Sequence, residues 1–544
     1  MKNSFCIHSF CIQLCVGLFA AAALAAPMPE LKPATEWDAG AAAHLLRRAG
    51  FGGTPAEVQK LASMTLEQAV ASLVDYESIP QTDPDFDPVD LPEPNVVQKK
   101  RKSLEPDSAK ELNQQLRQLS RLQMEDLRAW WMRRMIETPR PLEEKMTLFW
   151  HGYFTSGFRE VRSSQMMFDQ NMLLRKYALG NFRDLLIKIS QNPAMLRYLD
   201  SESNRKDAPN ENYARELLEL FTMGEGNYGE KDIKEAARAL TGWTIRNGEF
   251  ASVGRMHDTG EKTFLGQTGN FDGEDVIDII LNQPATAQHL ARKLLLFFVT
   301  PEPSQEMIDA LATEIRGSGY DMREVMRRLF SSQTFYAPEV RHSLIKSPVQ
   351  LVVGTIRSLE IEPSDLSAFV AATKGMGQQL FQPPNVKGWD GDRKWITTAT
   401  IYARYNFASA LLTGTGTKQA NRMMGEMGGP MRHQRMVAQR FNVERSLDAD
   451  LGIDSHGIQV EQENQPPYNP MAIIRKEGLR SADQVLNHFV DRLLGMKVDH
   501  LQRRQLRQLL ANGKRRFDAQ SNEGVVRTLT LINAILAMPE YQAF

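Results

Sequence analysis

The segment 209–223 carries three polar residues at the spacing of one helical face. They recur at positions i, i+4 and i+7 and are Asn212, Glu216 and Glu219. Two carboxylates one helical turn apart can share a cation, or act as general acid and general base when burial separates their pKa values. We therefore take both glutamates as candidate catalytic residues and Asn212, with Arg238, as candidate ligand-binding residues. The alternative is a solvated face whose carboxylates form ion pairs with Arg215 and Arg238.

A histidine stands among aromatic residues in the run Phe149–Phe154, whose sequence is FWHGYF. An imidazole in apolar surroundings can be a catalytic base or a ligand in a pocket, so His151 is a candidate catalytic residue. The alternative is a core histidine that bonds to the backbone. The catalytic hypothesis expects His151 to face Glu216 or Glu219.

The loop 255–266 brings together several ionisable residues, among them His257 and Asp258. These two could ligate a metal or act as an acid–base pair, because functional residues concentrate on loops held by a rigid scaffold. They are the remaining candidate catalytic residues. In the alternative interpretation this is a surface loop in which Asp258 caps the backbone.

The loop 382–391 is rigidified by two prolines and carries Trp389 and Asp390, with Trp395 close behind. Aromatic platforms beside acid and amide side chains suit stacking on sugar rings or binding of cations. Trp389, Asp390 and Trp395 are therefore candidate ligand-binding residues. The alternative is a packed structural loop whose tryptophans fill the core.

A methionine-rich stretch lies further along the chain. Its thioethers and imidazole are Met423, Met424, Met427, Met431, Met436 and His433. Such ligands can hold Cu(I) in an exported protein, which gives a weaker hypothesis of metal handling. The alternative is a flexible loop rich in adaptable side chains.

Standard catalytic and nucleotide-binding signatures are absent from the sequence. It contains no P-loop, no His-Glu-x-x-His, no Gly-x-Ser-x-Gly and no dinucleotide fingerprint, so no cofactor is identified. The formal net charge is −1, and the basic runs at 99–102 and 514–516 are short. We therefore expect no nucleic-acid binding.

The N-terminus predicts export. The chain begins with one cation, Lys2, followed by an apolar run over 11–24 and small residues at Ala23 and Ala25, the pattern of a signal peptide cut after Ala25. All 3 cysteines lie within this segment, so the mature chain would have no disulfide, thiolate zinc site or iron–sulfur cluster. A periplasmic or secreted protein without a transmembrane segment in its mature chain is expected.

Helical periodicity dominates the 544 residues, and 42% apolar residues suffice for a large core. We predict an all-α fold, a large multi-helix domain with long loops and at most one small β-hairpin, near 243–250. Helices are predicted at 40–50, 108–138, 141–153, 163–179, 181–191, 209–223, 230–242, 273–281, 284–299, 304–316, 321–332, 344–359, 395–412, 481–495, 499–511 and 523–537.

Composition divides the chain into four parts. After the signal peptide at 1–25, a main helical body is predicted over 26–412, with a proline-rich linker at 77–95 inside it. Residues 413–470 are rich in Gly and Met and predict a flexible insertion. Residues 471–544 predict a C-terminal helical group that packs on the main body.

Seven segments together resemble a bacterial family, domain-of-unknown-function family 1800. They are 44–52 (HLLRRAGFG), 141–154 (PLEEKMTLFWHGYF), 210–224 (NENYARELLELFTMG), 232–243 (DIKEAARALTGW), 257–266 (HDTGEKTFLG), 346–354 (KSPVQLVVG) and 380–391 (LFQPPNVKGWDG) with Trp395. The segments are long, in order and spread over nearly the whole mature chain. The resemblance implies an exported, mostly helical protein, and supplies no catalytic residues. It also suggests a partnership with an exported sulfatase-like protein, because genes of the two kinds often lie side by side.

Two main functional hypotheses follow. The first is an exported accessory or binding protein that works with a sulfatase-like hydrolase on an extracytoplasmic polymer or ester. The second is a carboxylate- or metal-dependent hydrolase, which requires Glu216, Glu219, His151 and His257 to converge in one cleft. The sequence leaves open whether the protein is an enzyme.

Overall fold

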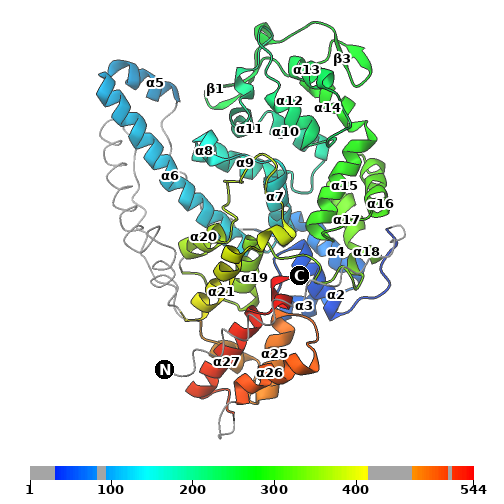
Figure 1. Ribbon diagram of the computed structural model, residues 1–544, viewed down its shortest axis with the longest axis vertical. Helices are drawn as coiled ribbons and strands as arrows, with labels where there is room; N and C mark the ends of the chain where they lie inside the picture. Colours follow the sequence, from blue (N-terminus) through cyan, green and yellow to red (C-terminus); the bar gives the residue numbers. More distant parts are fainter. Residues whose placement is uncertain (1–30, 82–93, 365, 414–467, 512–516) are drawn as a thin grey trace.

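The computed structural model describes residues 31–81, 94–364, 366–413, 468–511 and 517–544 (Figure 1). Within these ranges nearly all regular structure is helical, which confirms the predicted all-α class. None of the helices there is both long enough and apolar enough to cross a membrane. The predicted signal peptide and the methionine-rich stretch 423–436 lie outside the described ranges, as does most of the predicted insertion.

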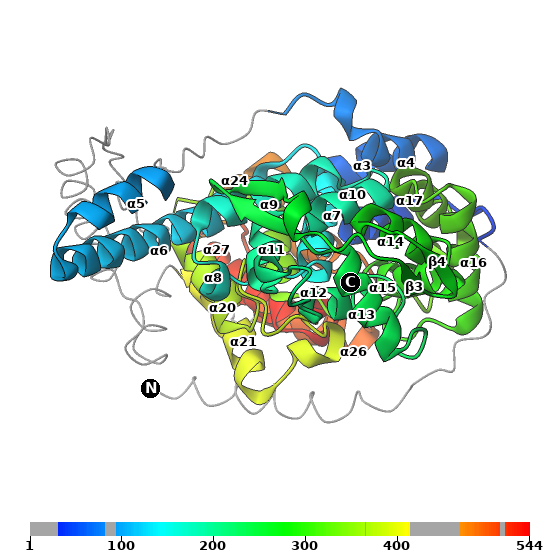
Figure 2. The same ribbon diagram turned by 90° about the horizontal axis from the view of Figure 1, so that it is seen from above.

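The N-terminal helices begin where side chains cap them. Thr54 and Glu57 form a capping box at one helix start, and Thr65 and Gln68 form another. The long helix α6 begins at Pro106 and ends just before Pro139, and α5 lies alongside its projecting first half (Figures 1 and 2). The elements are α2 (Ala39–Ala49), α3 (Pro55–Ala62), α4 (Leu66–Val74), η1 (Tyr76–Ser78), α5 (Pro94–Ser103) and α6 (Pro106–Glu137).

The middle of the chain forms most of the molecule. Two predicted helices, 141–153 and 273–281, have the predicted bounds, whereas the predicted helix 209–223 is shorter and covers Asn212–Glu219. The helices are α7 (Pro141–Tyr153), α8 (Phe158–Val161), α9 (Ser164–Lys176), α10 (Phe182–Ser190), α11 (Pro193–Tyr198), η2 (Ser201–Ser203), α12 (Asn212–Glu219), α13 (Glu230–Ala239), η3 (Gly254–Met256), α14 (Gly273–Leu281), α15 (Pro284–Phe298), α16 (Gln305–Gly317), α17 (Met322–Phe330), α18 (Gln333–Tyr336) and α19 (Pro348–Ser358).

Two small antiparallel hairpins interrupt the helices, one more than the sequence analysis allowed. Strand β1 (Trp243–Arg246) pairs with β2 (Glu249–Ser252), and β3 (Lys262–Phe264) pairs with β4 (Gln267–Gly269). The first hairpin turns at Asn247 and Gly248, both at positive φ, which is the common two-residue turn. The second turns at Leu265, at φ 46°, followed by a glycine. A leucine gives no turn signal, which is why this hairpin was not predicted.

The C-terminal helices share a core with the middle of the chain. Residues of α25 and α27 belong to the same buried apolar cluster as residues of α6 and α19, and α21 packs directly on α27. In Figure 1, α25 and α27 lie at the bottom of the molecule, with α21 above them. The elements of this part of the chain are α20 (Leu366–Gly375), η4 (Asp392–Trp395), α21 (Thr398–Thr413), α24 (Met471–Lys476), α25 (Ala482–Leu493), α26 (His500–Ala511), α27 (Asn522–Leu536) and α28 (Pro539–Gln542).

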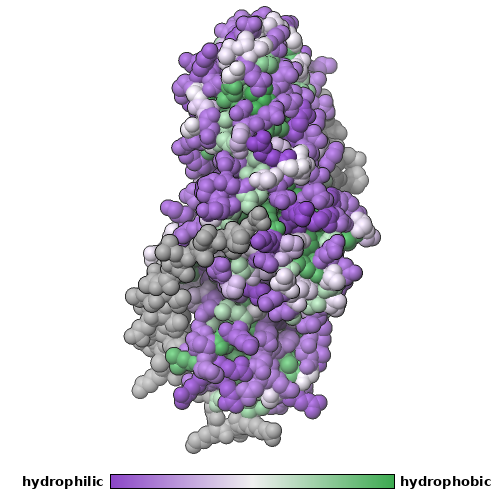
Figure 3. All heavy atoms as spheres, turned by 90° about the vertical axis from the view of Figure 1, so that its right-hand side faces the viewer, coloured by the Kyte–Doolittle hydropathy of each residue, from purple (hydrophilic) through white to green (hydrophobic). Residues whose placement is uncertain are grey.

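A second buried cluster holds the upper helices together, and α7 contributes to both. Trp150 of α7 belongs to the upper cluster and Leu148 to the lower one, so α7 links the two cores. On the face of the molecule in Figure 3 the surface is mainly hydrophilic, with apolar residues in small separate groups. The apolar side chains are thus mostly used for packing.

Helix α7 is buried although it carries charged residues. Glu144 has no exposed surface. It accepts hydrogen bonds from Trp131 Nε1 at 2.9 Å, from Arg175 Nε at 2.7 Å and from Arg134 Nε. Burial by itself would raise the pKa of Glu144, but Arg175 and Arg134 outweigh burial and hold this pKa below its usual value. One carboxylate therefore ties α6, α7 and α9 together.

Candidate functional site

A surface cleft of about 570 Å³ lies between the end of α11 and the loop that follows α20. One aromatic ring comes from each side, Tyr198 from α11 and Trp389 from the loop. Amide and charged side chains complete the walls: Gln379, Gln382, Asn385, Arg159, Glu160 and Lys374. A volume in this range is typical of sites that take a small molecule or a short piece of polymer.

The loop is held against the C-terminal end of α7. Gly388 has φ +80°, and a Cβ on it would collide with the carbonyl oxygen of Gly152, so only glycine allows this close approach. Thr155 Oγ1 donates to the carbonyl oxygen of Val386 at 2.6 Å. The Phe381 carbonyl accepts from Phe158 N–H at 2.9 Å. Trp389 is therefore presented by a fixed loop.

His151 lies beneath this loop and holds it. Its side chain is 1% exposed, and its Nε2 accepts a hydrogen bond from the Phe381 backbone N–H at 3.1 Å. The imidazole centroid lies 5.1 Å from that of the Trp131 ring and 5.8 Å from that of Trp389. Burial lowers the pKa of His151 to about 3, so the ring is neutral at physiological pH. Such an imidazole fits the structural alternative, because its Nε2 lone pair is already engaged.

The other two candidates of this region, Asp390 and Trp395, do not line the cleft. Asp390 is exposed and lies near Lys293, where its charge opposes the lowering effect of burial on the pKa of that lysine. Trp395, in η4, is 8% exposed and is not one of the residues that line the cleft. Of the three candidates Trp389, Asp390 and Trp395, Trp389 is the one that lines the cleft.

Neither glutamate of α12 lines the cleft, but Glu216 lies near its wall. Glu216 is half-buried; burial first, and then Glu219, raise its pKa, while Lys387 of the loop opposes this. The charge of Glu216 also raises the pKa of Tyr198, after burial and Glu160, so Glu216 lies near the cleft wall. Glu219 accepts a hydrogen bond from the Tyr228 hydroxyl at 3.4 Å. Neither glutamate forms an ion pair with an arginine within the described parts of the chain.

Asn212 starts α12 and ties it to the cleft. Its Nδ2 donates to the carbonyl oxygen of Leu199 at 3.1 Å, and Leu199 lines the cleft. The amide of Asn212 is thereby committed to the backbone next to Tyr198. Arg215, by contrast, pairs with Glu230 at 2.8 Å and with Glu211 at 3.4 Å.

His257, Asp258 and Arg238 form a separate cluster around the hairpins. Asp258 accepts from Arg238 Nε at 2.7 Å and from Gly260 N–H at 2.8 Å, and Arg238 lowers its pKa. His257 Nδ1 is 2.9 Å from the carbonyl oxygen of Thr241, to which it donates. None of these side chains is part of the cleft wall. The structure therefore brings Glu216, Trp389 and His151 to one region and leaves His257 and Asp258 outside it.

Several cleft residues escaped the sequence analysis. Tyr198, Arg159 and Glu160 carry no motif, because they reach the loop only through tertiary packing. Gln382 and Asn385 belong to the quoted loop motif and stand on either side of its two prolines, which was a usable signal. Within the part of the chain that the structure describes, no three His, Cys, Asp or Glu side chains group closely enough to hold a metal ion.

Comparison with known proteins gives one result. The chain matches no curated protein and no solved structure. A family model described as "Protein of unknown function (DUF1800)" matches residues 44–543, nearly the whole chain and all seven segments quoted above. On this match the chain belongs to the DUF1800 family.

Proposed function

We propose that this protein is an exported binding protein that holds a segment of a sugar polymer in the cleft between Tyr198 and Trp389. The observation that carries the proposal is the meeting of two aromatic rings with amide and charged side chains in one open cleft. Sugar rings stack on aromatic faces, and their hydroxyl groups exchange hydrogen bonds with amides and carboxylates. The fixed loop adds to affinity, because little conformational freedom is lost on binding.

Export and partnership are parts of the same proposal. The signal-like N-terminus supports a periplasmic or secreted location, where polymeric sugars occur. The partner would be an exported sulfatase-like hydrolase, to which this protein presents a sulfated polymer. Affinity purification of the tagged mature chain, co-expressed with an exported sulfatase-like protein, tests this. Failure of the two purified proteins to associate, with and without polymer, would refute the partnership.

Replacing Trp389 by Ala is expected to weaken polymer binding at least about tenfold, because a stacking ring contributes on the order of 1.4 kcal/mol. Titration calorimetry with chondroitin sulfate, unsulfated chondroitin and dextran measures the effect. Tyr402→Ala is the matched control, since Tyr402 is 60% exposed and lies outside the cleft wall. Equal affinities of the wild type and the Trp389 variant would exclude the cleft as the binding site.

Because His257 lies outside the cleft, a hydrolase built on all four predicted residues is not supported. A hydrolase that uses Glu216 without His257 is the second candidate function, favoured by the raised pKa of Glu216 beside Glu219. A carboxyl whose pKa is raised keeps its proton to a higher pH and, near the cleft wall, could donate that proton to a leaving group. Our first proposal expects the purified protein alone to release no product from sulfate-ester, phosphate-ester and glycoside substrates. Product release that Glu216→Gln reduces about a hundredfold or more would instead establish the hydrolase. Glu211→Gln is the control, because Glu211 pairs with Arg215.

A further inference from the structure

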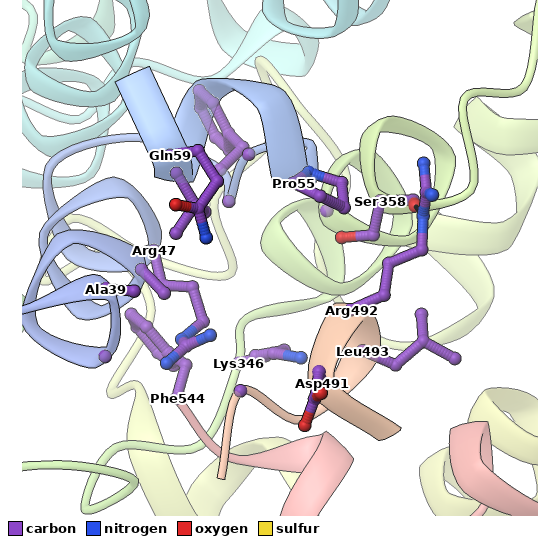
Figure 4. A pocket seen from close by; sticks show the side chains of 18 of the residues that line it. Ala39, Arg47, Pro55, Gln59, Lys346, Ser358, Asp491, Arg492, Leu493 and Phe544 are labelled. Atoms are coloured by element: carbon purple, nitrogen blue, oxygen red, sulfur yellow. Dashed lines mark hydrogen bonds between the residues drawn. The ribbon is translucent and has the colours of Figure 1, made fainter. Parts of the chain in front are cut away.

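A second cavity, of about 420 Å³, shares no lining residue with the cleft (Figure 4). Its walls come from α2, α3, α19 and α25, together with Lys346 and Phe544. Figure 4 shows Arg47, Lys346 and Asp491 along its lower side, with Gln59, Pro55 and Ser358 above. None of these residues entered the candidate sites discussed so far.

Two cations of this cavity lack a counter-ion. Arg47 Nε is buried without a hydrogen-bond partner, and its guanidinium packs against Gly495. Lys346 is 7% exposed, and its Nζ lies 3.7 Å from the centroid of the Tyr541 ring. Neither side chain forms an ion pair within the described ranges, although Asp491 stands on the same wall. The other cation of the wall, Arg492, is already paired with Glu360.

More positive charge is buried behind the wall. Arg48 has no exposed surface and leaves Nε and Nη1 without partners, although its Nη2 donates to the Val340 carbonyl at 2.6 Å. Lys145 Nζ also lacks a partner and lies 5.3 Å from the Phe51 ring and 5.2 Å from the Phe544 ring. Phe51 and Phe544 line the cavity, so Lys145 stands directly behind its aromatic wall.

Such a cluster is costly unless negative charge balances it. Burial lowers the pKa of Lys346, and Arg47 and Arg404 lower it further. Burial and Arg341 lower the pKa of Arg47 to about 10. Asp392 is the acid whose charge opposes the lowering of the Arg48 pKa, but its Oδ1 already accepts from the Ile345 N–H at 3.0 Å. Arg47 and Lys346 line the same cavity, so an anion bound there would balance their charge.

We propose that this cavity binds a small organic anion through an oxyanion group held by Arg47 and Lys346. Guanidinium and ammonium groups are the usual partners of phosphate, sulfate and carboxylate oxygens, and such bonds strengthen when water is excluded. The apolar part of the ligand lies against Phe51, Val58 and Leu493, which line the same cavity. A volume of about 420 Å³ leaves room for such a group beyond the oxyanion itself.

Replacement of Lys346 by Met tests the proposal when the melting temperatures of the wild type and the variant are compared without and with ligand. Without ligand, the variant is expected to melt at or above the wild-type temperature, because a buried unpaired cation is removed. With about 10 mM phenyl phosphate, benzoate or inorganic phosphate at constant ionic strength, the wild type should be stabilised and the variant should not. If Lys346 had only a structural role, the variant would melt at a lower temperature without ligand and would still be stabilised by the anions.

Two further variants make the test decisive. Arg47→Gln should weaken binding of phenyl phosphate about tenfold or more in titration calorimetry, whether or not the Lys346 variant folds. The exposed Lys394→Met should respond like the wild type. The proposal is overturned if no probe stabilises the wild type, or if both cavity variants keep its response. Tighter binding of inorganic phosphate than of phenyl phosphate would refute the organic part of the ligand.

Discussion

Replacing Glu144 by Gln should lower the free energy of unfolding by about 3–5 kcal/mol, because the buried Arg175 loses its acid partner and the buried Arg134 keeps only the longer pair with Glu143, at 3.6 Å. Arg134 is 3% exposed and Arg175 4% exposed, and both donate to this carboxylate, as does Trp131 Nε1. The amide of Gln keeps the shape of the side chain but loses the charge and half of the acceptor oxygens. Urea denaturation followed by tryptophan fluorescence measures the loss.

Glu137→Gln is the matched control for this change. Glu137 lies at the end of the same helix α6 and pairs with Arg133 at 3.2 Å, but both side chains are exposed, at 47% and 40%. An exposed pair contributes about 0–1 kcal/mol, so this variant should unfold almost like the wild type. If the Glu144 variant loses less than about 1 kcal/mol, the carboxylate does not tie α6, α7 and α9 together in the way the contacts indicate.

Acidification from about pH 7 to pH 5 should destabilise the protein by about 2 kcal/mol through His151 alone, with a further loss in the same direction through His44. Both side chains are 1% exposed. Burial lowers both pKa values below the ordinary 6.5, with the nearby Arg48 adding to the effect at His44, and to about 3 at His151. Below pH 6.5 the unfolded chain binds protons that the folded chain excludes. Stability therefore falls by about 1.4 kcal/mol per pH unit for each histidine, until the folded pKa is reached.

His151→Gln isolates this contribution, because a Gln oxygen can still accept from the Phe381 N–H but does not titrate. Its unfolding free energy should depend on pH less steeply than that of the wild type, by about 1.4 kcal/mol per unit between pH 6.5 and 5. Equal slopes in the wild type and the variant would show that His151 does take up a proton in the folded state.

Local rules in the sequence determined most of the helices. Pro141 is the first residue of one helix and Asp272 caps the start of another, and the predicted helices 141–153 and 273–281 have the observed bounds. The loop 382–391 was also predicted to bind a ligand, and the structure places Trp389 in the cleft wall. Short helices such as α8 and α18 were missed, since four residues give no periodicity.

Only the tertiary structure decided which polar groups meet. The segment 44–52 predicts a helix with a glycine stop, yet packing turns Arg47 toward Lys346 and bonds His44 Nε2 to the carbonyl oxygen of Phe335, 291 residues away, at 2.9 Å. Likewise, Asp258 was a catalytic candidate by sequence and is paired with Arg238 in the fold. Helix formation depends on neighbours within a few residues, so sequence suffices for it. Burial, charge pairing and the resulting pKa values depend on segments that are distant in the chain, so they exist only once the chain is packed.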